Sequence, residues 1–152
     1  MNTDYKPILY YPSNGEDLRQ IKALKEDKSV LVYDQIHSQI AELVLCRYPS
    51  LPAKDLVDNN EYVNMKSSAD KLGCWVYYPW NRSFVHILDE ENFIEVRTNR
   101  NRNKISKEEQ KQLQSKKIAI AGLSVGRSAA VTIATERVAG TLVLADFDLL
   151  EL

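Results

Sequence analysis

The stretch KIAIAGLSVGRSAAVTIATERVAGTLVLADFD, residues 117–148, decides the fold of the C-terminal part of the chain. Residues 118–121 form a continuously apolar run, which is typical of a strand in a parallel sheet. A glycine follows at once, residues 128–138 carry apolar side chains at helical spacing, and residues 141–145 form a second apolar run. The sequence therefore predicts a strand, a helix and a second strand joined by a right-handed crossover.

The turn between the first strand and the helix has the chemistry of an anion site. Unpaired N–H groups and the helix dipole meet at a helix N-terminus, and together they hold phosphate. Gly122 is predicted to allow the tight turn, and Gly126 to let a ligand approach the backbone. Asp146 ends the second strand, where an acid commonly accepts hydrogen bonds from a ribose hydroxyl. These residues predict a nucleotide site.

The glycine pattern leaves two alternatives open. The segment G-L-S-V-G is shorter than the usual G-x-G-x-x-G and places Ser124 where a glycine is expected. After a strand and before a helix, G-x-S-x-G is also the signature of a hydrolase nucleophile elbow. That interpretation needs a histidine after the serine, whereas His37 and His86 both precede it. The turn could also serve the fold alone.

A basic segment precedes this motif. Its basic residues are Arg97, Arg100, Arg102 and Lys104. They fit either a solvated linker or an arginine cluster that binds phosphate, since the guanidinium fork bonds oxygens in pairs. Ser106 and Glu109 then form a capping box that starts a helix.

Residues 1–96 predict a small α+β domain. Residues 5–11 are expected as a strand, residues 16–28 as a helix, and a second helix follows Asp34. Two apolar runs around a Pro-Trp-Asn-Arg-Ser turn predict a β-hairpin over residues 74–88. The aromatic side chains of this hairpin are expected in the core, with a partner surface as the alternative. His86, alone in its strand, is expected to be structural.

Composition sets outer limits on function. The chain has 152 residues, a net charge of −1 and 44% hydrophobic residues, which gives no bulk attraction for nucleic acid or an anionic membrane. No apolar run reaches the length of a membrane span, and the first residues lack the pattern of a signal peptide. Cys46 and Cys74 have no metal-ligand spacing, so a reduced, cytoplasmic protein without a metal site of its own is expected.

Taken together, the C-terminal residues resemble the nucleotide-binding segment of ThiF-type adenylyltransferases, the superfamily of ubiquitin-activating enzymes. The resemblance rests on the glycine turn, the following helix, and a strand that ends in Asp146-Phe147-Asp148 with an acidic, apolar stretch over residues 149–152. Arginines ahead of a Glu/Gln-containing helix are also similar to that family. The resemblance covers roughly residues 97–152.

This resemblance implies the start of a Rossmann-like fold that binds MgATP and adenylates a carboxylate, such as the C-terminus of a ubiquitin-like protein. It implies that Asp146 binds the ribose, with Asp148 supporting it. It implies that Arg100 or Arg102 meets phosphate oxygens of its own or of a neighbouring subunit, since family members usually form homodimers. The backbone positions implied to hold the phosphates are Gly122, Ser124 and Gly126.

The domain organisation expected from the sequence has three parts: an N-terminal domain over residues 1–96, a basic linker and helix over 97–116, and an incomplete nucleotide-binding fold over 117–152. Because one strand–helix–strand unit cannot form a whole ligand crevice, the chain is expected to be an inactive N-terminal fragment of the enzyme. Two other functions stay open. One is a protein-binding module on this scaffold, and the other is part of an NAD-binding oxidoreductase.

Overall fold

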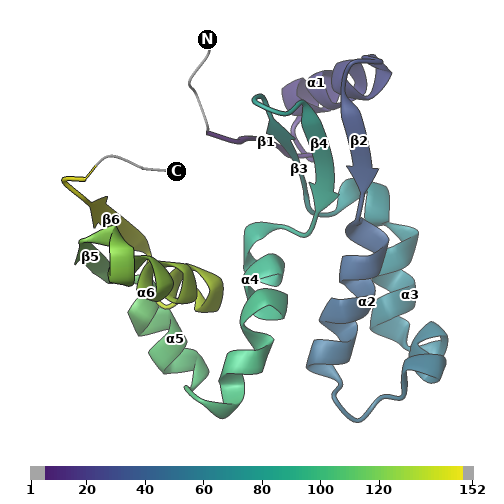
Figure 1. The fold of residues 1–152 in the computed structure, drawn as a ribbon. Coiled ribbons are helices and arrows are strands. Elements are labelled where there is room, and N and C mark those ends of the chain that lie inside the picture. The colour runs from purple at the N-terminus through teal and green to yellow at the C-terminus, as the bar shows by residue number, and fades with distance from the viewer. Residues whose placement is uncertain (1–5, 149–152) are drawn as a thin grey trace. The chain divides into compact units, whose positions relative to one another are not determined.

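The computed structural model describes residues 6–148 and shows a chain of mixed α/β class. The chain divides into two compact units, Met1–Val96 and Arg97–Leu152 (Figure 1). Residues 97–116, expected as a linker and helix, belong to the second unit. Among the described residues, no helix is long and apolar enough to cross a membrane.

The first unit is built on a four-stranded mixed sheet with the strand order β1-β3-β4-β2. Its strands are β1 (Ile8–Tyr10), β2 (Leu31–Asp34), β3 (Cys74–Tyr78) and β4 (Ser83–Ile87). The antiparallel pairing of β3 with β4 confirms the predicted hairpin. β1 pairs antiparallel with β3, whereas β2 pairs parallel with β4 at the other edge of the sheet.

Helix α1 (Gly15–Glu26) packs against this sheet through aromatic side chains of the hairpin. The buried cluster consists of Ile21, Val30, Trp75 and Phe84. The ring centroids of Trp75 and Phe84 lie 4.6 Å apart. Large aromatic side chains bury much apolar surface, so they dominate the energetics of such a cluster. The aromatic residues of the hairpin strands therefore serve mainly as core, and Trp80, in the turn, remains 41% exposed.

Three further helices complete the first unit: α2 (Ile36–Arg47), α3 (Asn60–Ser67) and α4 (Glu90–Thr98). A second core cluster of Ile36, Ile40, Leu43, Ala69 and Leu88 lies among them. Short 3₁₀ helices, Ala53–Asp58 and Ala69–Lys71, flank α3. The segment with Pro49 and Pro52 that follows α2 therefore leads into short helical turns rather than into extended chain.

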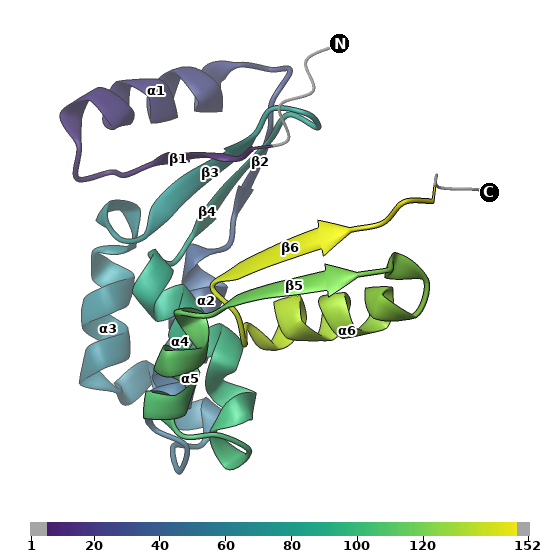
Figure 2. The same ribbon diagram turned by 90° about the vertical axis from the view of Figure 1, so that its left-hand side faces the viewer.

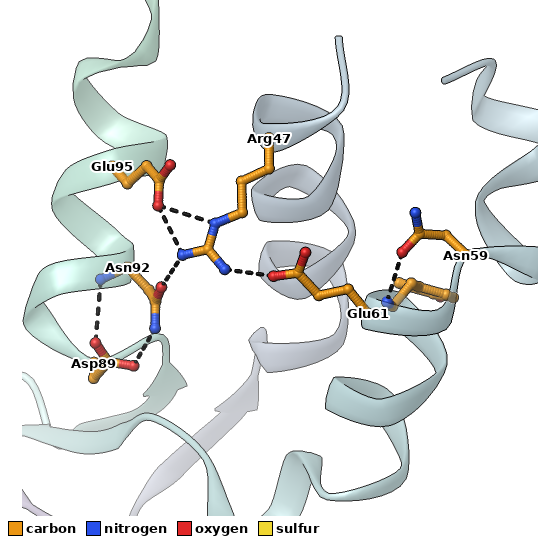
Figure 3. Close-up of polar contacts among 7 residues, drawn as sticks. Arg47, Asn59, Glu61, Asp89, Asn92 and Glu95 are labelled. Atoms are coloured by element: carbon orange, nitrogen blue, oxygen red, sulfur yellow. Dashed lines mark hydrogen bonds and ion pairs between the residues drawn. The ribbon is translucent and has the colours of Figure 1, made fainter. Parts of the chain in front are cut away.

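Arg47 ties these helices together (Figure 3). Its Nη1 donates to Glu61 of α3 at 2.5 Å, and its Nη2 donates to Glu95 of α4 at 2.8 Å. The same Nη2 donates to Asn92 Oδ1 at 2.7 Å. The hydrogen bond to Glu95 is the main reason that the pKa of Arg47 lies above its ordinary value. One guanidinium thus fixes α4 and α3 to the C-terminal end of α2.

His86 has a structural role. It is 1% exposed, and both ring nitrogens have partners. Nδ1 lies 3.1 Å from Asp34 Oδ1, and Nε2 lies 2.9 Å from the carbonyl oxygen of Leu72. Its ring stacks on Trp75 with centroids 4.5 Å apart. No ring nitrogen is left to act on a substrate.

The second unit contains the predicted strand–helix–strand motif. Strands β5 (Lys117–Ala121) and β6 (Thr141–Ala145) pair in parallel, which confirms the prediction, and α6 (Leu123–Glu136) connects them (Figure 2). A 3₁₀ helix, η3 (Asn99–Asn103), and α5 (Lys107–Gln114) precede β5. The capping box predicted at the start of α5 is present.

The bounds of α6 differ from the prediction. The helix begins at Leu123, directly after Gly122, rather than near residue 128. The segment G-L-S-V-G is therefore one turn residue followed by helix. The helix ends at Glu136 because Arg137 adopts the left-handed conformation with φ 52°. Gly140 does not end it; an added Cβ there would lie 1.8 Å from the carbonyl oxygen of Gln114, so the glycine permits a close backbone contact.

Candidate functional site

Gly122 forms the whole connection between β5 and α6. Its φ of 85° and ψ of 107° lie where side-chain-bearing residues rarely go. No atom lies within 4 Å of the position that a Cβ would take, so the glycine is needed for its backbone angles rather than for space. The sharp turn leaves the first amides of α6 at the end of the sheet with open space beside them. The amides of the first turn after Leu123 are the donors that an anion would meet, because the N–H of Leu123 itself is bonded to Asp146.

Asp146 lies at the same turn. It directly follows β6, and the register aligns Ala121 with Ala145, so both strands end together. One carboxylate oxygen of Asp146 accepts the N–H of Leu123 at 2.5 Å, and the other accepts the N–H of Asp148 at 3.1 Å. These bonds, the first above all, hold the pKa of Asp146 below its ordinary value. An ionised carboxylate therefore stands at the N-terminus of α6, where the helix dipole favours it.

Ser124 and Gly126 belong to the first turns of α6. Ser124 is exposed at the N-terminal end, beside the amides that would hold phosphate. Gly126 instead faces the sheet, because an added Cβ would lie 2.8 Å from Cγ2 of Ile120. Gly126 thus has a packing role, and the approach of a ligand to its backbone stays a prediction. It lets the helix lie close to β5, the role of the third glycine in dinucleotide folds.

Arg100 and Arg102 lie away from this turn. Both are exposed in η3, and Asn101 between them is buried. Asn101 donates to the carbonyl oxygen of Glu136 at 2.8 Å, which places η3 at the C-terminal end of α6. A helix of 14 residues is about 20 Å long, so the length of α6 separates these arginines from Gly122. Within one chain, the structure does not bring the predicted arginines and the glycine turn together.

Sequence reasoning missed two residues that set this arrangement, Asn101 and Gln110. Both are buried, at 5% and 8% exposure. Asn101 Nδ2 donates to Gln110 Oε1 at 3.1 Å, and Gln110 Nε2 donates to the carbonyl oxygen of Arg137 at 2.7 Å. Gln110 directly follows the capping-box glutamate, at a position where helices commonly bury an apolar side chain. A polar glutamine at this usually apolar position was the sign in the sequence that a buried hydrogen bond is formed here.

The nucleophile-elbow alternative does not fit the geometry. An elbow serine sits on a strained turn between strand and helix. Within residues 6–148, the non-glycine residues with positive φ are Arg82 and Arg137, so Ser124 has ordinary helical angles. Both histidines lie in the other unit, and the ring of His86 is fully engaged. Ser124 therefore lacks the conformation that the chemistry needs.

The environment of Cys74 does not make it a reactive centre. Burial raises the pKa of the Cys74 thiol to about 11, and its Sγ lies 3.7 Å from the carbonyl oxygen of Leu88. A buried thiol with a raised pKa is unreactive at neutral pH. In the part of the chain that the structure describes, no group of three or more His, Cys, Asp or Glu side chains could hold a metal ion.

Comparison with known proteins gives one relative. No family model matches the chain, and no solved structure matches it. An uncharacterized protein of Mycobacterium tuberculosis is 36% identical over 145 residues, which cover 95% of this chain and 18% of the relative. The chain thus spans less than a fifth of the length of that protein. Since the relative carries no functional description, the chemistry of the site rests on its own geometry.

Proposed function

We propose that the chain forms the first part of the ATP site of a ThiF-type adenylyltransferase, an enzyme that activates a carboxylate by transfer of AMP. One observation carries the proposal: the carboxylate of Asp146 and the first amide of α6 meet at 2.5 Å. This contact places the proposed ribose acceptor beside the next amides of the first turn of α6, which would hold the phosphates, as a nucleotide requires.

The contact between Asp146 and Leu123 is compatible with nucleotide binding. A carboxylate offers about four lone pairs, and the two backbone N–H groups use one on each oxygen. The remaining lone pairs are available to two ribose hydroxyls. Asp148 supports this acid through its backbone N–H. The phosphates would meet the amides after Gly122, where nothing fills the space beside the turn.

On this proposal, Arg100 and Arg102 bind the phosphates of a nucleotide that is held by a second copy of the chain. The length of α6 separates Arg100 and Arg102 from the glycine turn of their own chain. In a homodimer they would reach the phosphates held by the partner and neutralise charge that builds at the α-phosphate. On this proposal, Mg²⁺ is held mainly by acids of the whole protein outside this chain.

A protein as long as the mycobacterial relative would have ample further chain to supply the remaining parts: the metal-binding acid, the acceptor site, and the surface for a ubiquitin-like or other carboxylate-bearing partner. These belong to the proposal for the whole protein. For this chain, the proposal concerns nucleotide binding at Gly122, Ser124 and Asp146.

The replacement Ser124→Asp tests the site, with Ser128→Asp as the matched control. Both serines are exposed on α6, but Ser128 lies one turn further from the amides. Aspartate in the first turn of a helix favours the helix, so the fold is kept while negative charge enters the phosphate position. We expect Ser124→Asp to weaken ATP binding about tenfold or more, which equals 1.4 kcal/mol or more, and Ser128→Asp to leave it nearly unchanged.

Isothermal titration of the whole protein, of which this chain is expected to be the N-terminal part, with ATP and, separately, with NAD measures this. Equal ATP affinity of the Ser124→Asp variant and the unaltered whole protein would contradict the placement of the phosphates. Tighter binding of NAD than of ATP would favour the oxidoreductase alternative over adenylation.

A further inference from the structure

The segment that carries Arg100 and Arg102 is held by the hydrogen bonds of two buried side-chain amides. In the second unit, the side chains of Asn101 and Gln110 are buried and hydrogen-bonded to each other. Asn101 also donates to the carbonyl oxygen of Glu136, the last residue of α6, and Gln110 donates to that of Arg137, which caps the helix. Buried amides with satisfied partners rigidify their surroundings, because breaking any bond leaves a buried polar group unpaired. We call residues 100–102 the arginine turn.

Because η3 is a 3₁₀ helix, the buried side chain of Asn101 also sets the directions of the side chains of Arg100 and Arg102. With three residues per turn, successive side chains point about 120° apart. When the side chain of Asn101 is fixed inward, those of Arg100 and Arg102 must diverge outward on either side of it. Both are exposed, and neither forms an ion pair with any residue that the structure describes. The backbone is fixed as well, since the carbonyl oxygen of Asn101 accepts the N–H of Lys104 at 2.7 Å.

A role in capping the C-terminal end of α6 would explain why Asn101 and Gln110 are buried amides. It would not explain why Asn101 lies between two arginines. The last carbonyls of a helix need donors, and side-chain amides supply them. That role is met whatever residues flank Asn101. Two unpaired guanidiniums on either side of an immobilised residue are arranged to bind an anion with little further loss of side-chain and backbone freedom.

We propose that Asn101 and Gln110 are positioning residues, which hold the arginine turn ready to bind the polyphosphate group of a nucleotide carried by a second copy of the chain. This inference rests on the proposed function, because that function supplies the nucleotide. The two can nevertheless fail separately.

The replacement Asn101→Ala in the full chain tests the positioning role, with Asn103→Ala as the matched control. Asn103 is an asparagine of the same 3₁₀ helix, but its side chain is exposed. The probe is inorganic tripolyphosphate, titrated while the Nε–H signals of the arginines are followed by NMR. We expect Asn101→Ala to weaken tripolyphosphate binding about tenfold, because the two arginine side chains and their turn must then be ordered on binding. Asn103→Ala should leave the affinity within about twofold of that of the unaltered chain.

Equal weakening by Asn103→Ala, or a folded Asn101→Ala variant that binds as tightly as the unaltered chain, overturns the positioning role. If Asn101→Ala does not fold, Gln110→Ala replaces it with the same expectation. In the unaltered chain, the backbone N–H groups of residues 100–102 should be as rigid in ¹⁵N relaxation as those of α6, and nanosecond motion there would also overturn it.

The double replacement Arg100→Ala/Arg102→Ala separates the two proposals. Unchanged tripolyphosphate affinity in this variant removes the arginines from the proposed function itself. Loss of affinity here, without loss in Asn101→Ala, overturns the positioning role alone. With ATP as the probe, a mixture of the double variant with Ser124→Asp should bind more tightly than either alone, because one pairing joins an intact glycine turn to an intact arginine turn. No recovery in the mixture overturns the part played by the second copy.

Discussion

Replacing Gly122 with alanine should destabilise the second unit by an amount that can be worked out from the backbone. Nothing would touch the added Cβ, so the cost is conformational. Holding a non-glycine residue in such a region costs about 1–3 kcal/mol. Alanine also restricts the unfolded chain, which offsets about 0.4–1 kcal/mol. The net loss should be about 1–2 kcal/mol, or a 5- to 30-fold larger open population.

Hydrogen exchange measured by mass spectrometry on peptides from residues 117–145 reads this population. Both tryptophans and all eight tyrosines precede residue 97, so tryptophan fluorescence in urea reports the first unit separately. The Gly122→Ala variant should exchange faster in β5 and α6 while its fluorescence transition stays in place. Gly15→Ala is the control, since Gly15 also has open space around it but has no positive φ. Unchanged exchange in the Gly122→Ala variant would refute the claim that its φ of 85° is required.

The remaining predictions concern one packing contact and one thiol. Gly140→Ala should destabilise the second unit more than Gly122→Ala, by about 3 kcal/mol or more, because the new Cβ would lie 1.8 Å from a backbone oxygen; the same exchange measurement checks the order of the two variants. For Cys74, the thiol is favoured over the thiolate in the folded state, with the pKa raised from 9.0 to about 11. Its stabilising effect is complete below pH 9 and is lost as pH rises towards 11, so urea midpoints of the first unit should fall across that window by less in Cys74→Ala than in the unaltered chain.

The elements that the sequence revealed are those whose signal is local. The hairpin from Cys74 to Tyr78 and Ser83 to Ile87 has strong apolar runs around a short turn, and the strand–helix–strand unit has runs that fit its periods. Strand β2 (Leu31–Asp34) was not predicted, because it pairs only with β4, which is far away along the chain. Helix α4 (Glu90–Thr98) was not predicted, because its apolar face is weak.

Within the site, the sequence predicted the glycine turn and the position of Asp146 at the end of β6. It did not show which glycine faces the sheet and which faces open space. Gly126 was interpreted as part of a loop, since a side-chain-free residue looks the same whether it faces a ligand or Ile120. The position of the arginines depended on how η3 folds back on the end of α6, and that contact is made by two buried amides. Long-range polar contacts of this kind leave no periodic trace in the sequence.

Because Gly126 lies so close to Ile120, substitutions at these two positions are expected to be coupled during evolution. A methyl group gained on the helix would require a methyl group lost from the strand, because the two share one small volume. Descendants of this fold that carry alanine in place of Gly126 should therefore carry alanine in place of Ile120, because valine would keep the γ-methyl group in the way, and the strand change should come first along any viable line of descent.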